Sequence, residues 1–382
     1  TYNRPLAKPW PYEIADGAGL DQSVALTWRP ETPHVPRLEP TARTAPSFPQ
    51  MALVITPEDA RRLARHPADL DHVNPQRLLC HLDATLGDTA AQFTSFAAAQ
   101  AACPDRSFDL ELICAGDADP APELMALAAD MTASGFAPAS VLVCPSVDRG
   151  STPPGSDWPP CPPLEMVHRA AARAFPDLVR GGGMVSFFPE LNRKRPPVEM
   201  LDFVSHGLCP IVHAADDISV METLATIPHI TRSARAIFGD RPYRIGPASI
   251  AMRQNPYGDR TLPNPHMGRV AMADDDPRHR AKFGAAYVIG LAAALAPADI
   301  AVWTPAALYG PRGVISDGPQ VWPIADALRQ LSKLAGAPVQ AAHHSDGFAQ
   351  LRVGDTELTV NLSSQDSPTL GAFDWQASAA KS

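Results

Sequence analysis

The chain has 382 residues, of which 45% are hydrophobic and 19% charged, which is typical of a globular protein with a sizeable core. Its formal net charge of −9 argues against a nucleic-acid or membrane-surface partner. No apolar run reaches the roughly 18 residues that a membrane-spanning helix needs, so we expect no membrane insertion.

Six cysteines are scattered through the sequence without a C-x-x-C pair, and several fall in apolar, strand-like runs. This spacing disfavours a zinc knuckle or a redox pair. It fits free thiols in a reducing compartment, so we expect a cytoplasmic protein. No signal peptide is recognisable. The sequence begins with Thr1 rather than Met, as expected for a piece of a longer protein.

Residues 1–48 are rich in proline and hold two strand-like pieces, residues 11–14 and 24–28. The segment between them, 15–19, has the composition of a hairpin turn. We therefore expect a β-hairpin followed by an extended linker. A hairpin is not stable alone, so it should belong to a β-unit completed elsewhere in the chain.

From residue 49 to 335, short apolar strands alternate eight times with helices. The predicted strands are residues 51–55, 77–82, 108–114, 140–144, 178–188, 201–205, 243–246 and 299–303. The helices expected between them are residues 57–65, 88–102, 122–134, 164–174, 219–238, 278–295 and 321–334. This alternation predicts a (β/α)8 TIM barrel with all strands parallel. A doubly wound sheet is the alternative, but no dinucleotide fingerprint follows the first strand.

After residue 335 the hydrophobic period changes to two. Strand-like segments at 348–353, 357–362 and 372–375 predict a small antiparallel β-domain over residues 336–382. Because the two ends of a barrel domain lie near each other, the N-terminal hairpin could join this sheet.

The stretch from Gly181 to Pro197 combines three glycines, an apolar run and then a carboxylate, an amide and three cations. We interpret it as a buried strand whose carboxyl end carries a polar cluster on irregular backbone, because Pro196 and Pro197 stop a helix there. In parallel barrels that end is the active face. Glu190 is thus a candidate catalytic acid or base. The alternative is a loop carboxylate neutralised by Arg193 or Arg195.

The same strand-end rule selects the other candidate site residues. They are Asp83, Ser146, Asn192, His206, His213, Asp216, Arg253, Asn255 and Thr304. Three long segments, 145–163, 189–200 and 247–275, follow strands on this face, and long loops in compact domains are often functional.

His206, His213 and Asp216 could transfer protons or bind a metal. A third ligand at a diagnostic spacing is missing, so we expect no metal and no other cofactor. Asp216 is alternatively an N-cap of the next helix. Arg253 could bind a carboxylate or stabilise an oxyanion, or it could form a salt bridge that anchors its loop.

Residues 181–197, 201–221 and 243–258 together resemble the barrel domain of the D-apionate lactonases, which act in bacterial catabolism of the branched sugar apiose. Residues 1–12 resemble the end of that family's preceding β-domain, most of which would then be missing here, and residues 336–382 would match its small C-terminal domain. The resemblance implies a hydrolase that opens D-apionolactone to D-apionate.

Because the resemblance itself assigns no catalytic residues, their roles follow from chemistry. A lactonase must activate water, stabilise an oxyanion and protonate the leaving alkoxide. We expect Glu190, His206 and His213 to transfer protons and Asp216 to orient an imidazole. For substrate binding we expect Asn192, Arg253, Asn255 and Asp83.

The four residues Glu190, His206, His213 and Arg253 should meet in one pocket. The partner is then a small sugar lactone or sugar acid, and self-association is left open. Two alternatives remain. One is a barrel glycoside hydrolase that pairs Glu190 with Asp83 or Glu111, and the other is a carbohydrate-binding barrel without catalysis.

Overall fold

The computed structural model of the chain describes residues 45–380 except 117–118, 153–156 and 259, together with residues 13, 15–18, 23 and 25–27. Two compact units divide the chain, residues 1–43 and residues 44–382. All helices and strands among the described residues belong to the second unit.

In the first unit the predicted turn is present, because Ala18 N donates to the Ala15 carbonyl at 3.0 Å. Gly17, inside this turn, has a φ of +76° that favours glycine. Residues 25–27, in the second predicted strand, are not part of a strand. Most of the predicted hairpin and linker lies outside the described residues, so the hairpin and its share in a β-domain stay predictions.

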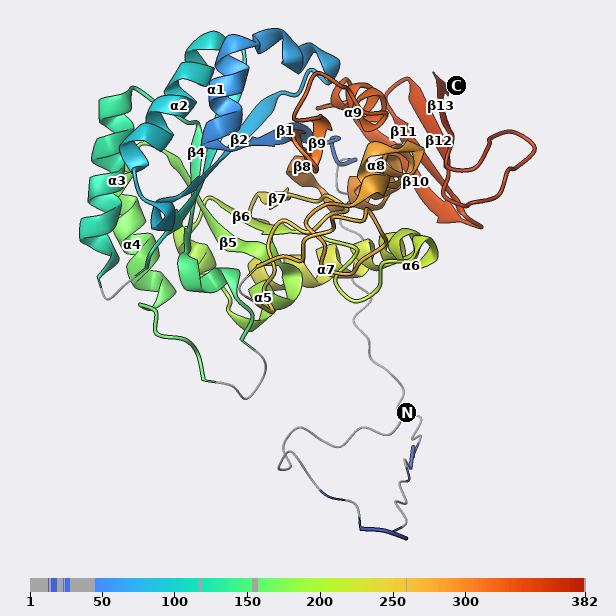
Figure 1. Cartoon of the computed structure of the whole chain (residues 1–382), viewed down its shortest axis with the longest axis horizontal. Helices are drawn as coiled ribbons and strands as arrows, with labels where there is room; N and C mark the ends of the chain where they lie inside the picture. The colour runs from blue at the N-terminus through green and yellow to red at the C-terminus, as the bar shows by residue number, and fades with distance from the viewer. Residues whose placement is uncertain are drawn as a thin grey trace. The chain divides into compact units, whose positions relative to one another are not determined.

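Eight parallel strands form a closed barrel in which each strand pairs with its neighbour in sequence and β8 pairs with β1 (Figure 1). They are β1 (Gln50–Ile55), β2 (Arg77–Asp83), β3 (Ser107–Cys114), β4 (Ser140–Pro145), β5 (Val179–Phe187), β6 (Phe203–Gly207), β7 (Tyr243–Ile245) and β8 (Ile300–Tyr309). A short strand, β9 (Gly313–Ile315), extends the sheet beside β8. The predicted (β/α)8 barrel is confirmed.

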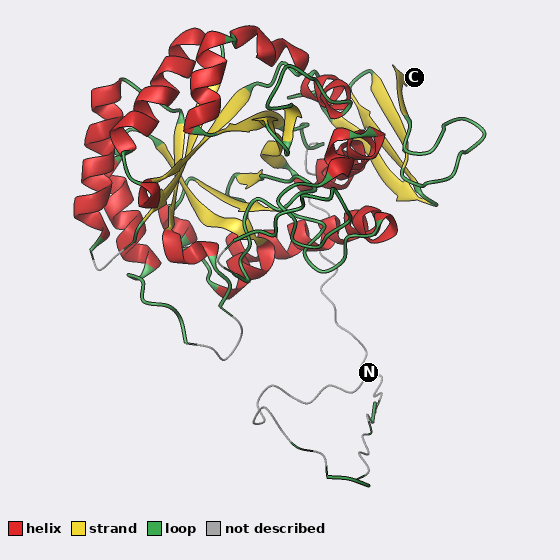
Figure 2. Ribbon diagram, in the orientation of Figure 1, coloured by secondary structure: helices red, strands yellow, loops and turns green. Residues whose placement is uncertain are grey.

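Helices surround the barrel on its outside (Figure 2). They are α1 (Pro57–Arg65), α2 (Thr89–Ala102), α3 (Pro120–Ser134), α4 (Leu164–Ala174), α5 (Phe188–Arg193), α6 (Asp217–Glu222), α7 (Ile227–Phe238), α8 (Lys282–Leu295) and α9 (Ile324–Ser332). Side-chain caps set several of their first turns, for example the capping box of Thr56 and Asp59 on α1. The single helix predicted over 219–238 is two helices joined by a 3₁₀ turn. Pro228 in the first turn of α7 has no N–H to donate back into that turn.

Helix α5 corrects the expectation of irregular backbone around Glu190. It starts directly after β5 and ends at Arg193, before Pro196 and Pro197. Pro189 lies in its first turn, where the missing N–H costs nothing. The two later prolines therefore limit the helix to six residues but do not prevent it. Glu190 sits in the first turn, where a carboxylate is favoured by the helix dipole.

Alternate residues of β2 and β3 face the barrel interior and form layers. The strand register pairs Leu79 with Asp109, His81 with Glu111, and Asp83 with Ile113. Because the strands are parallel, later residues lie nearer the carboxyl end. The layer of His81 and Glu111 is thus below Asp83, which is nearest the mouth of the barrel.

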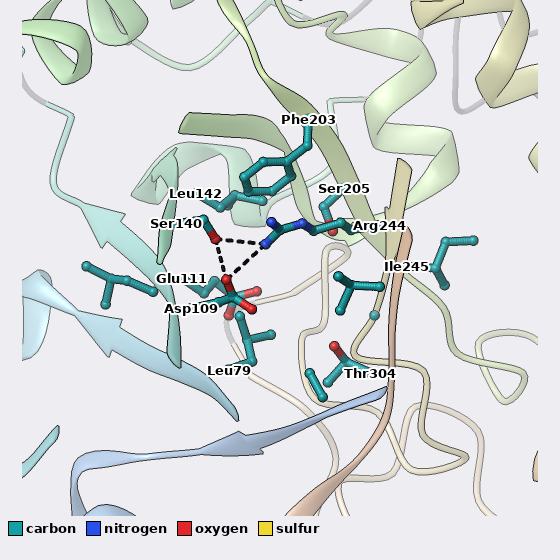
Figure 3. Close-up of a pocket in the computed structure, with 14 residues that line it drawn as sticks. Leu79, Asp109, Glu111, Ser140, Leu142, Phe203, Ser205, Arg244, Ile245 and Thr304 are labelled. Atoms are coloured by element: carbon teal, nitrogen blue, oxygen red, sulfur yellow. Dashed lines mark hydrogen bonds and ion pairs between the residues drawn. The ribbon is translucent and has the colours of Figure 1, made fainter. Parts of the chain in front are cut away.

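The amino-terminal half of the interior is closed by a charge cluster around Asp109, which Figure 3 shows with Arg244 and Ser140. Arg77 Nε lies 2.6 Å from Asp109 Oδ2, and Arg244 Nη1 lies 3.2 Å from Asp109 Oδ1. Burial alone would raise the pKa of Asp109, but the two arginines hold it below its usual range. A small cavity here is lined by Asp109, Ser140 and Arg244, and also by Glu111 and Thr304. Asp109 and Ser140 lie early in β3 and β4, so we assign the Asp109 cluster to barrel stability.

One of the three glycines, Gly183, is required by a close approach of β5 to β6. A Cβ at Gly183 would lie 2.0 Å from the Ser205 carbonyl oxygen, and its φ is +127°. A side chain is excluded at this position on both grounds. The strand register shifts between Gly183 and Phe187, just before the chain reaches Glu190.

The C-terminal segment forms a four-stranded antiparallel sheet, as its period-two pattern predicts. Its strands, in spatial order, are β10 (Val339–Ser345), β11 (Phe348–Val353), β12 (Thr356–Asn361) and β13 (Trp375–Ala379). The sheet packs on α8, whose residues 283–295 are all buried. Residues 46–48 pair with residues 336–339, so the segment entering the barrel lies beside the segment that leaves it.

Two further observations concern composition. All six cysteines are free thiols, and four of them are buried. Among the described residues, no helix has the length and apolar character needed to cross a membrane.

Candidate functional site

Polar and charged side chains gather at the carboxyl ends of the barrel strands, which we call the mouth. They come from β2, from β3, from the segments after β4 and β7, and from α5 and the residue that follows it. Those with named contacts are His81, Asp83, Glu111, Asp148, Arg149, Glu190, Arg193, Lys194 and Arg253.

His81, Glu111 and Arg253 form a continuous hydrogen-bonded group. His81 Nδ1 lies 2.7 Å from Glu111 Oε1. Arg253 binds both carboxylate oxygens, with Nη2 at 3.1 Å from Oε2, and also donates to the Val185 carbonyl. Burial would raise the pKa of Glu111, but Arg253 and His81 lower it to about 2. Glu111 is therefore ionised at neutral pH, deep in the barrel.

The other ring nitrogen of His81 is available for chemistry. The His81 side chain keeps 26% of its surface exposed, and no described residue hydrogen-bonds its Nε2. When Nδ1 carries the hydrogen of the neutral ring and donates it to Glu111, Nε2 carries the lone pair. This is the arrangement of a general base held in one tautomer by a buried acid.

Arg253 does not carry an open guanidinium into the mouth. Its two Nη groups contact Glu111, the Val185 carbonyl and, at 3.3 Å, His81 Nδ1. The carboxylate that it binds is thus part of the protein, and the salt-bridge interpretation describes its contacts. Its effect on substrate is indirect, through the position and charge of Glu111.

Asp83 is also held by an arginine. Its Oδ1 accepts from Thr85 N and Oγ1, and Arg149 Nη1 lies 2.5 Å from its Oδ2. Arg149 in turn donates to Ser146. The Asp83 carboxylate therefore links β2 to the segment after β4, and it has no unpartnered oxygen for substrate.

Glu190 is 3% exposed, and its carboxyl group lies beside Arg193, Ser151 and Tyr257. Arg193 Nη1 lies 3.3 Å from Oε1, while Oε2 is buried without a hydrogen bond. Burial raises the pKa of Glu190 above its usual value despite Arg193. Burial and the Glu190 carboxylate together raise the pKa of Tyr257, from the segment after β7. Glu190 therefore keeps its proton to a higher pH than an exposed glutamate does.

His206 lies inside the barrel wall and has no accessible nitrogen. It is fully buried, its Nδ1 lies 2.9 Å from the Gly207 carbonyl, and its Nε2 lies 2.6 Å from Tyr243 Oη. Burial lowers its pKa to about 4, so it is neutral. With both nitrogens occupied, it cannot exchange protons with a ligand in the mouth.

His213 and Asp216 lie in the loop between β6 and α6. His213 is exposed, and its ring centroid is 6.2 Å from that of Tyr257. Asp216 caps α6 by accepting from Ser219 N at 2.9 Å and from Ser219 Oγ at 2.6 Å. The N-cap interpretation of Asp216 describes these contacts, and nothing in them orients an imidazole.

Asn192 and Asn255, the two amides predicted to bind substrate, form hydrogen bonds within their own segments. Asn192 is exposed on α5 and accepts from Arg195 at 3.1 Å. Asn255 is buried, donates to the Arg260 carbonyl and accepts from Tyr257 N. Asn255 thereby shapes the turn that places Tyr257 beside Glu190.

The structure brings the predicted residues together only in part. Glu190 and Arg253 are both at the mouth, while His206 is in the wall. His213 lines an apolar pocket between α5 and the loop after β6, to which Tyr257 also contributes. Strand-end position alone does not tell inward from outward side chains. Alternation along a strand tells them apart, because on β2 it places His81 on the same side as Asp83, and on β3 it identifies Glu111 as an inward side chain. His81 is the residue that strand ends alone do not select.

No group of three or more His, Cys, Asp or Glu side chains within the described ranges is arranged to hold a metal ion. The charges at the mouth are instead arranged as carboxylate–guanidinium and carboxylate–imidazole contacts.

Comparison with known proteins gives a family and a fold. Residues 51–336 match the family described as "D-apionate lactonase, TIM barrel domain". A D-apionate lactonase from Brucella anthropi is 43% identical over 353 residues, which is 88% of this chain and 57% of that protein. The chain thus spans little more than half the length of this relative.

Two solved structures share the fold at low sequence identity. One is a GH30 endoxylanase from Clostridium papyrosolvens C71, with a TM-score of 0.50 and 9% identity over 85% of this chain and 83% of that one. The other is a 4-O-alpha-L-rhamnosyl-beta-D-glucuronidase from Fusarium oxysporum 12S, with a TM-score of 0.51 and 10% identity over 85% and 79%. At these identities the likeness concerns the fold alone.

Proposed function

The chain belongs to the D-apionate lactonase family, and on this premise we propose that it hydrolyses a small sugar-acid lactone, D-apionolactone, to D-apionate. The proposal includes a role in carbohydrate catabolism, as the name of the relative suggests. The matched residues, 51–336, include every side chain of the mouth described above.

The observation that carries the mechanism is the His81–Glu111 pair. A water molecule beside His81 Nε2 loses a proton to this nitrogen as its oxygen attacks the lactone carbonyl carbon. The ionised Glu111 stabilises the imidazolium that forms and keeps Nδ1 protonated. Arg253 fixes Glu111 and prevents it from taking up the proton itself.

Glu190 is the proposed proton donor to the leaving group. The tetrahedral intermediate collapses by breaking the bond between the carbonyl carbon and the ring oxygen, which takes the proton of Glu190. Its raised pKa makes it a better donor than an ordinary carboxyl group. The product carboxylic acid and the imidazolium release their protons, and Glu190 regains one.

The test is pH-stat titration of acid release from D-apionolactone by the purified chain. Each of His81→Gln and Glu190→Gln should lower kcat by roughly 10² to 10⁴. His343→Gln is the matched control, because this histidine is exposed on β10 and remote in sequence from the mouth. A His81→Gln variant with the kcat of the control would exclude the general-base role.

Two other functions have distinct outcomes in parallel assays. Turnover of aryl glycosides that Glu190→Gln abolishes, with lactones untouched, would indicate a glycoside hydrolase. The structure favours it less, because Asp83 and Glu111, its candidate second carboxylates, are each bound by an arginine. Binding of sugar acids without any turnover would indicate a non-catalytic carbohydrate-binding barrel.

A further inference from the structure

A small recess lies beside Glu190, between α5 and the segment that follows β4. Its lining residues are Val147, Asp148, Gly150, Thr152, Trp158, Pro159, Met184, Glu190, Arg193 and Lys194. Both walls come from chain that directly follows a barrel strand, so the recess is part of the mouth.

Two carboxyl groups in this recess each have one unpartnered oxygen. Asp148 and Glu190 are both 3% exposed, and Asp148 Oδ2 and Glu190 Oε2 are buried without a hydrogen bond. A buried acceptor without a partner costs roughly 1–3 kcal/mol. Native proteins keep few such groups, and each calls for an explanation. Hydroxyl groups satisfy both, because a hydroxyl donates to Asp148 Oδ2 and accepts the proton that Glu190 carries as the proposed acid.

Cations hold the other oxygen of each carboxylate and so fix the unpartnered ones in place. Lys194 Nζ binds Asp148 Oδ1, and Arg193 Nη1 binds Glu190 Oε1 and, at 2.6 Å, Ser151 Oγ. Lys194 and Arg193 each contact a carboxyl oxygen, so their charges are paired within the recess. Hydroxyl groups fit there, because they can both donate and accept hydrogen bonds.

Trp158 adds an apolar surface at the edge of the recess. Its side chain is 51% exposed, and Lys194 Nζ lies 5.7 Å from its ring centroid. A flat, half-exposed aromatic ring next to fixed carboxylates is the combination that suits a polyhydroxylated ligand, with C–H groups against the ring and hydroxyls on the oxygens.

We propose that this recess binds hydroxyl groups of a polyhydroxylated acid or its lactone, with Asp148 as a residue that determines specificity for them. The inference rests on the proposed function, because it names the part of the substrate that lies beside Glu190. Asp148 Oδ2 accepts one hydroxyl and Trp158 packs against the adjacent carbons. The carboxyl end of the ligand lies outside the recess.

Binding of the open-chain product tests this without turnover. The purified chain is titrated with D-apionate and, separately, with pentanoate, which has the same number of carbons and no hydroxyl. Tryptophan fluorescence and calorimetry report binding. Trp158→Phe assigns the fluorescence signal, and Asp326→Asn is the control, since Asp326 is 69% exposed on α9.

We expect D-apionate to change the fluorescence of Trp158 and pentanoate to leave it unchanged. Asp148→Asn should raise the Kd for D-apionate roughly tenfold or more, because a hydrogen bond to a charged group is lost. If that variant does not fold, Trp158→Ala replaces it, because the half-exposed ring is dispensable for the core. By calorimetry it should weaken D-apionate binding several-fold.

Three results would overturn the inference: no binding of D-apionate, equal affinity for pentanoate, or an unchanged Kd in the folded variants. The proposed function fails separately. Specific binding of D-apionate with no hydrolysis of its lactone refutes the lactonase activity alone. Turnover with an unchanged KM in Asp148→Asn refutes the hydroxyl site alone.

Discussion

Replacing Glu111 by Gln removes the charge that Arg253 and His81 share, and the structure sets the size of the effect. The pKa of Glu111 falls from 4.5 to about 2 in the folded chain. A group whose folded pKa is depressed contributes stability above its unfolded pKa and loses it as pH falls through the folded value. For these two values the contribution is about 3 kcal/mol at pH 7 and roughly half of that at pH 3.

The assay is urea unfolding of the wild-type chain and of Glu111→Gln at pH 7 and pH 3, followed by circular dichroism. The variant should be about 3 kcal/mol less stable at pH 7, and the deficit should shrink by about half at pH 3. Asp326→Asn, at an exposed ion pair, should change stability by less than about 0.5 kcal/mol at either pH. A deficit that is the same at both pH values would refute the argument that the Glu111 charge is stabilised by its partners.

Three further outcomes follow from the contacts. Tyr243→Phe removes the hydroxyl bound to His206, so it should lower the free energy of unfolding by urea by about 1 kcal/mol. Its kcat on the lactone should be unchanged, because neither side chain reaches the mouth. A large loss of kcat would show that His206 takes part in catalysis. Asp216→Ala should lower the urea midpoint through loss of the α6 cap and leave turnover at wild-type level; an orienting role for Asp216 predicts the opposite pattern. Gly183→Ala should yield misfolded protein or lose roughly 3 kcal/mol or more, whereas Gly87→Ala, at φ +77° with open space around its Cβ, should lose about 1 kcal/mol. Equal thermal stability of the two glycine variants would contradict the steric argument.

The barrel could be predicted from sequence because its signals are local. Most strands are short apolar runs, and some helices carry recognisable caps, such as Thr56 on α1 or Asp119 on α3. Strand β10 was not predicted, because its sequence, VQAAHHS, has few of the residues that favour strands. It forms a strand because it pairs with β11.

The site was only partly predictable because it depends on side-chain direction and on pairing between distant residues. Arg253 was found from its position after β7, but its partner Glu111 lies 142 residues away in sequence. His206 met the strand-end rule, yet its ring turns into the wall toward Tyr243. Asp148 carries no motif, and its unpartnered oxygen exists only when α5 and the segment after β4 meet.

Helix α8 is apolar on every side from residue 283 to residue 295, and it contacts strands β10, β11 and β12 of the C-terminal sheet. An outer helix of a barrel normally needs a polar face toward water. Here the C-terminal sheet covers the outer face of α8, and residues 44–382 form one compact unit. Cutting the chain near residue 336 would therefore not release two stable pieces. It would expose the apolar surface of α8 on the barrel, and this surface would promote self-association. A shortened version made for crystallography or engineering therefore has to keep the sheet or carry charged substitutions on the outer face of α8.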